Sequence, residues 1–163
     1  MRRLMYLLLG ILTLVLQGTL MPAIFGGPWL PNLILVWIIM LAILRSRQVA
    51  LTVAVIGGIL YDTVLSNFFG LHLFPYVITA YAMSSWAPRV YEEQWYMSAL
   101  LVAGGSLLDG LLRMAMLFFM DAQFSFVAYA LHFVLPEMVA NGLLGIVVHW
   151  ILWRFDKKEE YRW

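Results

Sequence analysis

Two stretches of the sequence combine a pair of glycines with an acid, and they are the best candidates for chemistry. The first reads VIGGILYD from Val55 to Asp62, and the pattern returns 47 residues later as VAGGSLLD from Val102 to Asp109. An ionisable side chain near the centre of a bilayer costs roughly 2.5–3.5 kcal/mol on insertion scales, so it normally faces protein. Small residues allow helix backbones to approach closely. We therefore interpret both stretches as helix-packing seams of a membrane protein, each with a buried acid.

The second acid has a basic residue one helical turn away. Asp109 and Arg113 are four residues apart, which places them on one helix face. We expect an ion pair within this helix, because a partner allows both groups to stay ionised. A role in binding a proton or a ligand is the alternative, since ionisable groups inside membranes are functional candidates by default.

Two further acids allow several interpretations. Asp62 lies just before a turn at the outer end of its helix, so it is either a cap at headgroup level or a buried contact to Arg113 or a partner. Glu137 follows Pro136, whose missing N–H loosens the local backbone hydrogen bonding. Glu137 can bond the freed backbone groups, pair with Arg113 or stay protonated, and the sequence leaves these three open.

Catalytic residue sets are not recognisable in the sequence. The string GGILYD does not match the GxGD pattern of intramembrane aspartyl proteases, no Ser has a legible His base, and no glycine-rich phosphate loop contains Lys. The chain has no Cys, which removes thiolate chemistry and Cys metal sites. His72 and His149 fall near interfaces, where a half-wet imidazole is ordinary, and His132 lacks a carboxylate at close helical spacing. We expect no enzyme activity, no cofactor and no metal.

Composition indicates an integral membrane protein. Of the 163 residues, 64% are hydrophobic and 12% are charged, whereas soluble domains contain about 25% charged residues. The Trp and Tyr residues gather mostly at the ends of apolar segments, which is typical of an interfacial belt and not of a nucleic-acid platform. We predict an all-α fold with residues 1–163 forming a single polytopic membrane domain.

Six apolar segments follow one another along the chain, at about 4–25, 30–44, 49–65, 71–86, 97–120 and 126–153. About 20 residues cross an average hydrocarbon core, so the second and fourth segments are short and the last two are long. Unequal lengths favour a curved, non-parallel bundle.

The distribution of basic residues predicts the topology. With the amino terminus inside, nine of the ten Lys and Arg residues fall on the cytoplasmic side, and the tenth, Arg113, lies within the fifth segment. This bias toward the cytoplasm favours six spans with both termini inside. The nine are Arg2, Arg3, Arg45, Arg47, Arg89, Arg154, Lys157, Lys158 and Arg162.

Three of the segments carry small or polar residues at a spacing of four, which places each set on one helix face. We expect these faces to look at one another or at a partner helix. The sets are Ala50, Ala54, Gly58 and Asp62; Leu101, Gly105, Asp109 and Arg113; and Glu137, Asn141, Gly145 and His149.

Two short motifs resemble the MreD family of rod-shape-determining proteins. The string PNLIL, from Pro31 to Leu35, resembles the family's P-D-L-hydrophobic opening, with Asn32 where Asp is more usual. The run from Gly58 to Asp62, followed by a turn and GLH from Gly70, resembles the family's G-x-x-x-D and G-L-H motifs. The likeness is best over residues 31–81, and the carboxyl-terminal half agrees mainly in hydropathy.

This resemblance implies a non-enzymatic scaffold subunit of the bacterial cell-elongation machinery in the inner membrane. Such proteins associate with the single-span protein MreC and, through it, with cytoplasmic MreB filaments and the RodA/penicillin-binding-protein synthase that makes lateral peptidoglycan. The resemblance also implies a six-helix bundle similar to the substrate-binding subunits of energy-coupling-factor transporters. Whether the chain forms a homodimer or a heterotetramer with MreC is left open.

We expect a transmembrane helix of MreC to dock on a small-residue face, and the basic tail to contact anionic lipid or a cytoplasmic partner. The alternative is a small-molecule-binding subunit of a transporter, with an outward-open cavity lined by Asp62, Arg113, His132 and Glu137. The candidate structural or partner-interface residues are Pro31, Asn32, Gly58, Asp62, Gly70, Gly105, Asp109, Arg113 and Glu137.

Overall fold

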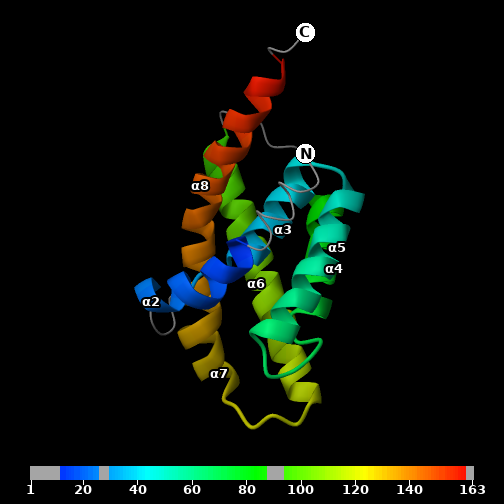
Figure 1. Cartoon of the computed structure of the whole chain (residues 1–163). Helices are drawn as coiled ribbons and strands as arrows, with labels where there is room; N and C mark the ends of the chain where they lie inside the picture. Colours follow the sequence, from blue (N-terminus) through cyan, green and yellow to red (C-terminus); the bar gives the residue numbers. More distant parts are fainter. Residues whose placement is uncertain (1–11, 26–29, 88–93, 161–163) are drawn as a thin grey trace.

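The computed structural model describes residues 12–25, 30–87 and 94–160, without the side chains of residues 153 and 155–160. Every regular element in these ranges is helical, and each predicted segment contains one helix (Figure 1). A π-helical turn, η1 (Leu16–Leu20), leads into α2 (Met21–Phe25) within one helix, Leu12–Phe25. The others are α3 (Leu33–Leu44), α4 (Arg47–Val64), α5 (Leu73–Trp86), α6 (Trp95–Phe119), and a last long helix made of α7 (Phe126–Tyr129), the π-helical turn η3 (Ala130–Val134) and α8 (Leu135–Glu160).

Three helices in the described ranges are long and apolar enough to cross a membrane: Arg47–Val64, Trp95–Phe119 and Phe126–Leu152. Two shorter helices, Leu12–Phe25 and Leu33–Leu44, are apolar as well. The uneven lengths expected from the sequence are therefore present, with α5 only 14 residues long and α6 25 residues long. The count of six spans stays a prediction.

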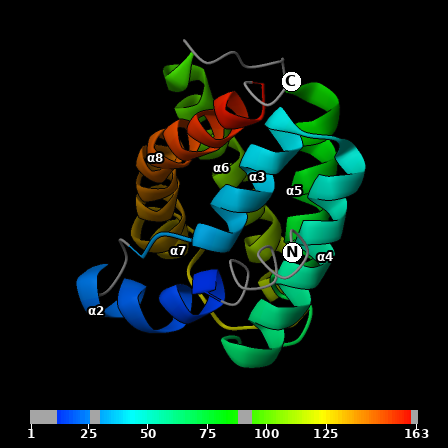
Figure 2. The same cartoon turned by 45° about the horizontal axis from the view of Figure 1, so that its top comes forward.

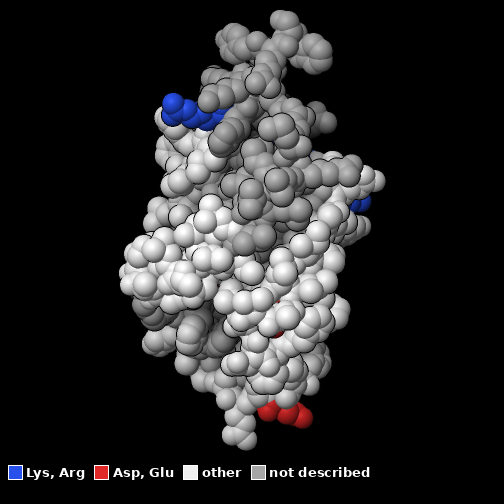
Figure 3. All heavy atoms as spheres, viewed as in Figure 1, with Lys and Arg blue, Asp and Glu red and all other residues white. Residues whose placement is uncertain are grey.

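The charged surface residues separate along the bundle. In Figure 3 the Lys and Arg atoms lie in the upper half of the visible face, and the larger group of acidic atoms lies at the opposite end. Arg45, Arg47 and Arg154 are exposed, and so is Asp121 in the turn after α6. This separation agrees with the positive-inside pattern. Among the basic residues used for the topology, Arg2, Arg3, Arg89 and Arg162 lie outside the described residues, as do the side chains of Lys157 and Lys158.

The short helix α3 is the centre of the bundle. It contacts α4 and α5 on one side and α6 and α8 on the other (Figure 2). Its sequence, LILVWIIMLAIL, is apolar all round, and a helix of that kind is buried either among other helices or in lipid. Most of its side chains are buried within this chain. The burial of α3 explains how so short a helix is accommodated, since its neighbours and not lipid cover it.

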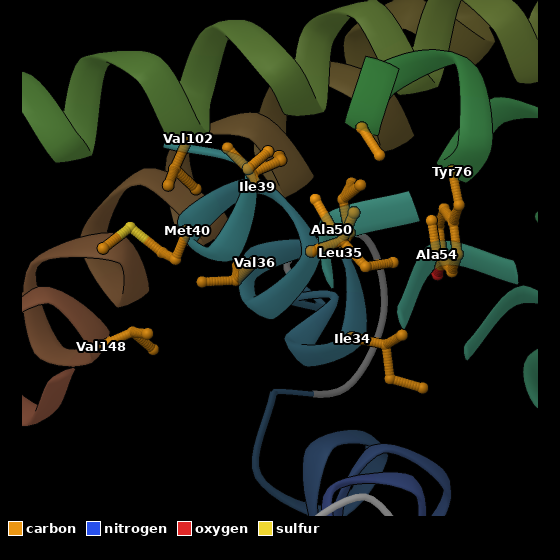
Figure 4. Packing of buried hydrophobic residues seen from close by; sticks show 13 residues of the cluster. Ile34, Leu35, Val36, Ile39, Met40, Ala50, Ala54, Tyr76, Val102 and Val148 are labelled. Carbon is orange, nitrogen blue, oxygen red and sulfur yellow. The ribbon is translucent and has the colours of Figure 1, made fainter. Parts of the chain in front are cut away.

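The hydrophobic core forms around α3 (Figure 4). Small residues of α4 and larger residues of the other helices meet its side chains, so that the core is filled from every direction. The fully buried members on α3 are Leu35, Val36, Ile38, Ile39 and Met40, and they pack with Ala50, Ala54, Tyr76, Val102 and Val148.

Each π-helical turn ends two residues before a proline. The N–H of Met21 bonds the Leu16 carbonyl before Pro22, and the N–H of Leu135 bonds the Ala130 carbonyl before Pro136. A proline ring clashes with the carbonyl four residues earlier, so a widened turn relieves the clash while backbone bonding continues. The loosening expected at Pro136 is thus an ordered π-helical turn.

The faces expected from the spacing of four are buried. All four predicted residues of α4 are its buried residues, and all four of the last set, on α8, are buried too; on α6 three are buried and Leu101 is half-buried. The faces meet helices of the same chain: a Cβ at Gly58 would lie 2.6 Å from the Leu73 Cα, and one at Gly105 would lie 2.7 Å from Ile39 Cδ1. Both glycine faces are therefore occupied by residues of the same chain.

Candidate functional site

Asp62 joins the end of α4 to the start of α5. Its carboxylate accepts hydrogen bonds from the backbone N–H groups of Gly70 (2.8 Å), His72 (3.0 Å) and Leu73 (3.0 Å), and it lies 2.9 Å from the His72 Nδ1. Only 4% of Asp62 is exposed. Of the two alternatives open for this residue, the structure selects a cap, but a buried one that belongs to the next helix. A bond to Arg113 is not part of it.

The remaining residues of the GLH motif complete this turn. Gly70 has a φ of +98°, a conformation that is easily adopted only by glycine. The His72 ring stacks at 4.2 Å from the Tyr61 ring, and His72 is 7% exposed. The expectation of a half-wet imidazole is therefore wrong for His72, because the carboxylate of Asp62 and the Tyr61 ring enclose it.

Asn32 forms a second polar cluster at the start of α3. Its Oδ1 accepts hydrogen bonds from the Leu35 N–H (3.1 Å), as a helix cap, and from the Tyr76 hydroxyl (2.9 Å). Its backbone N–H donates to Asn141 Oδ1 at 2.7 Å, and the Asn141 amide donates to Ser106 Oγ at 3.0 Å. This Asn32 cluster joins α3, α5, α6 and α8, and all of its side chains are buried.

Gln17 connects the first helix to the start of α3. Its amide donates to the Pro31 carbonyl at 3.0 Å and accepts from the Leu33 N–H at 2.8 Å. These two bonds satisfy backbone groups that precede and open α3, where no intrahelical partner exists. Both bonds to the Asn32 side chain use an acceptor oxygen, and the Asp that the resembling motif has at this position would also supply one.

Arg113 forms the third cluster, between α6 and α8. Its Nε lies 2.8 Å from Asp109 Oδ2, and its guanidinium also donates a hydrogen bond to Glu137. The predicted ion pair between Asp109 and Arg113 is confirmed. Of the three alternatives for Glu137, the structure shows the pairing with Arg113. This acid cluster, Asp109–Arg113–Glu137, is buried, with Asp109 0% exposed and Glu137 9% exposed.

The contact at Asp109 is an ionic approach without hydrogen-bond alignment. Although 2.8 Å separates it from the guanidinium nitrogen, neither carboxylate oxygen of Asp109 has a hydrogen-bond donor among the described residues, and the Arg113 Nε has no acceptor there. The two groups lie close together, but the angular requirement of a hydrogen bond is not met. Glu137 therefore has the better-formed interaction with Arg113.

The two other histidines have separate environments. His149 on α8 is 1% exposed, and its Nδ1 lies 2.8 Å from the Ser98 hydroxyl on α6, so the half-wet environment expected for it is also wrong. His132 Nδ1 lies 3.0 Å from the Ala128 carbonyl within its own helix. Within the described ranges, no group of three His, Asp or Glu side chains is arranged to hold a metal ion.

An open groove between α5 and α6 has a volume of about 340 Å³ and an apolar lining. Phe74 and Phe119 border it and are 59% and 82% exposed. None of the charged candidates lines this groove, whose residues are Phe74, Pro75, Ile78, Leu112, Ala115, Met116 and Phe119.

Sequence reasoning missed Gln17, Tyr76 and Ser106. Gln17 had a usable signal, because it is a lone amide within a predicted span and such residues normally face protein. Tyr76 and Ser106 had none, since tyrosine and serine are common in membrane helices and their partners are far away in the chain. Pro31, the first residue of the PNLIL motif, contributes its carbonyl, which accepts the hydrogen bond from the Gln17 amide.

Comparison with known proteins gives one match that covers nearly the whole chain. The family model for the rod shape-determining protein MreD matches residues 1–158. No curated protein and no solved structure matched the chain. The match extends well beyond residues 31–81, where the motifs lie, and includes the helices that carry the acid cluster. The chain therefore belongs to the MreD family of rod shape-determining membrane proteins.

Proposed function

We propose that this protein is a non-enzymatic scaffold subunit of the bacterial cell-elongation complex that binds the transmembrane helix of MreC. In this proposal it is a single domain that crosses the inner membrane six times, with both termini in the cytoplasm. The proposal is supported by the contacts of the buried polar residues. Each of the three clusters joins helices of this chain to one another.

The contacts argue for a packing role. The Asp62 carboxylate accepts hydrogen bonds from backbone N–H groups of the following turn. The Asn32 side chain caps α3 and accepts a hydrogen bond from the Tyr76 hydroxyl. Buried polar groups that are bonded in this way stabilise one arrangement of helices. A substrate site would require such groups to converge on an open space, where they could bond a ligand instead.

A small-molecule-binding subunit is the competing function, and the groove argues against it. A binding site for a metabolite combines a cavity of about 300 Å³ or more with a few well-placed polar groups. The groove between α5 and α6 has the volume, but its lining is apolar and excludes Asp62, Arg113, His132 and Glu137. An apolar groove on a membrane helix bundle suits a hydrocarbon surface such as another helix.

We place the MreC helix in this groove. The Gly58 and Gly105 faces are filled by Leu73 and Ile39 of the same chain, which removes them as docking surfaces. The groove is lined by the large exposed side chains of Phe74, Ile78 and Phe119 and by the smaller Ala115, so side chains of a second helix can pack between them. Helices in membranes associate through such van der Waals packing.

Contacts with MreB filaments and with the RodA/penicillin-binding-protein synthase are indirect in this proposal, through MreC. The basic residues at the cytoplasmic end have a separate role. Each Lys or Arg near an anionic lipid surface contributes about 1 kcal/mol of attraction, which orients the bundle in the membrane.

Complementation with affinity capture tests the proposal. The tagged chain is expressed in a rod-shaped bacterium that lacks its own family member and produces MreC of the same source. We expect rod shape to return and MreC to be captured from detergent extracts, while a tagged, unrelated polytopic protein captures none. A folded, membrane-inserted chain that restores no rod shape and captures no MreC, or that yields a bound metabolite, would contradict the proposal.

A further inference from the structure

We propose that the acid cluster, Asp109–Arg113–Glu137, is a proton-binding site that holds one proton at neutral pH. The proton can reside on either carboxyl group of the cluster, and the state with the proton on Asp109 is the more populated one. This inference goes beyond the scaffold function and does not depend on the identity of any partner.

The charges of the cluster do not balance. Two carboxyl groups surround one guanidinium, so the fully ionised cluster has a net charge of −1. Arg113 is the one buried Lys or Arg side chain among the described residues. An uncompensated charge in a low-dielectric interior costs several kcal/mol even after relaxation, and a buried acid normally avoids that cost by binding a proton.

The two acids differ in their hydrogen bonding. Glu137 accepts a charge-assisted hydrogen bond from the Arg113 guanidinium. Asp109 is 0% exposed, and neither of its oxygens receives a hydrogen bond within the described part of the chain. The ionised form of Asp109 is thus the less stabilised of the two, and its carboxyl group is the better place for the proton.

The surrounding groups do not supply a second positive charge. Tyrosines of α4, α5 and α7 interact electrostatically with the cluster, and neutral phenols leave its charge unchanged. The helix α3 contributes no titratable side chain. The nearby imidazole is already bonded to a carboxylate of its own. The titratable groups near the cluster are Tyr61, Tyr76, Tyr129 and His72. Asp62 is bonded to His72 and to the turn before α5, not to the cluster.

A bound proton determines how stability varies with pH. At neutral pH the folded chain then binds one proton more than an unfolded chain, in which a solvated carboxyl group is ionised. Stability falls with rising pH wherever the folded state binds more protons. The wild type should therefore lose stability as the pH rises from about 4, where an unfolded aspartate ionises, to neutral and above. Asp109→Asn should remove that part of the dependence, because the amide does not titrate.

Infrared spectroscopy of the full chain in nanodiscs tests the site. We expect the carbonyl stretch of one protonated carboxyl group per chain at neutral pH, shifted by isotopically labelled aspartate and lost completely in Asp109→Asn. The matched control is Asp121→Asn, at an exposed turn, which should leave the band unchanged. Because labelling uses the wild type, the test holds even if Asp109→Asn fails to fold. A spectrum without this band, or a band that only labelled glutamate shifts, would overturn the proposal.

Discussion

Asp62→Ala is expected to lower the free energy of unfolding by about 3 kcal/mol, or roughly 1 kcal/mol for each buried N–H group that loses its acceptor. The three groups belong to Gly70, His72 and Leu73. Their loss frees the turn between α4 and α5, and the His72 ring also loses its carboxylate. Asp62→Asn keeps one acceptor oxygen and should have an intermediate effect. The measurement is the fraction of protein that stays monodisperse in detergent after heating.

The control for this prediction is Asp121→Asn. Asp121 is an exposed acid in the turn after α6, with a φ of +53° that asparagine also tolerates. We expect its heat stability to match the wild type. Equal stability of Asp62→Ala and the wild type would refute the capping role of Asp62.

Gly58→Leu is expected to disrupt the seam between α4 and α5 and to abolish rod-shape complementation. A Cβ at residue 58 would lie 2.6 Å from the Leu73 Cα, and backbone atoms cannot move aside as a side chain can. Overpacking of a closed core costs roughly 1–3 kcal/mol, and this clash lies at the upper end of that range. Heating in detergent and cell morphology provide the two measurements.

The second glycine pair provides matched controls for this substitution. At Gly105 the clash is with Ile39 Cδ1, the flexible end of a side chain, so Gly105→Leu should cost less than Gly58→Leu. At Gly104 nothing lies within 4 Å of a new Cβ, so Gly104→Leu should be neutral. Equal heat stability and equal rod-shape complementation of Gly58→Leu and Gly104→Leu would show that the close approach of α4 and α5 does not stabilise the fold.

Periodicity predicted which helix faces are buried but not what they touch. The spacing of four identified the buried face of α4 completely, because a 3.6-residue period places such residues together. The partner of Asp62 could not be read in the same way, since it depends on the backbone path of residues 66–72. That path is determined by the positive φ of Gly70.

Long-range polar pairs were beyond the reach of local patterns. The bond between the Asn32 N–H and Asn141 spans 109 residues, and the sequence contains no signal that joins them. The same holds for Tyr76, whose hydroxyl reaches Asn32 only after α3 and α5 pack. The pair of Asp109 and Arg113 was predictable because both residues lie on one helix.

The most direct test of the scaffold function is site-specific cross-linking to MreC in native membranes. The chain has no cysteine, so single cysteines carrying a photo-reactive group can be placed at will. Ile78 and Met116 probe the groove, and exposed Val55 on α4 and Val147 on α8 serve as controls. We predict adducts with the MreC transmembrane helix from the two groove positions and none from the controls. Absence of MreC adducts from all four positions, in a chain that is folded and produced at normal levels, would contradict the account.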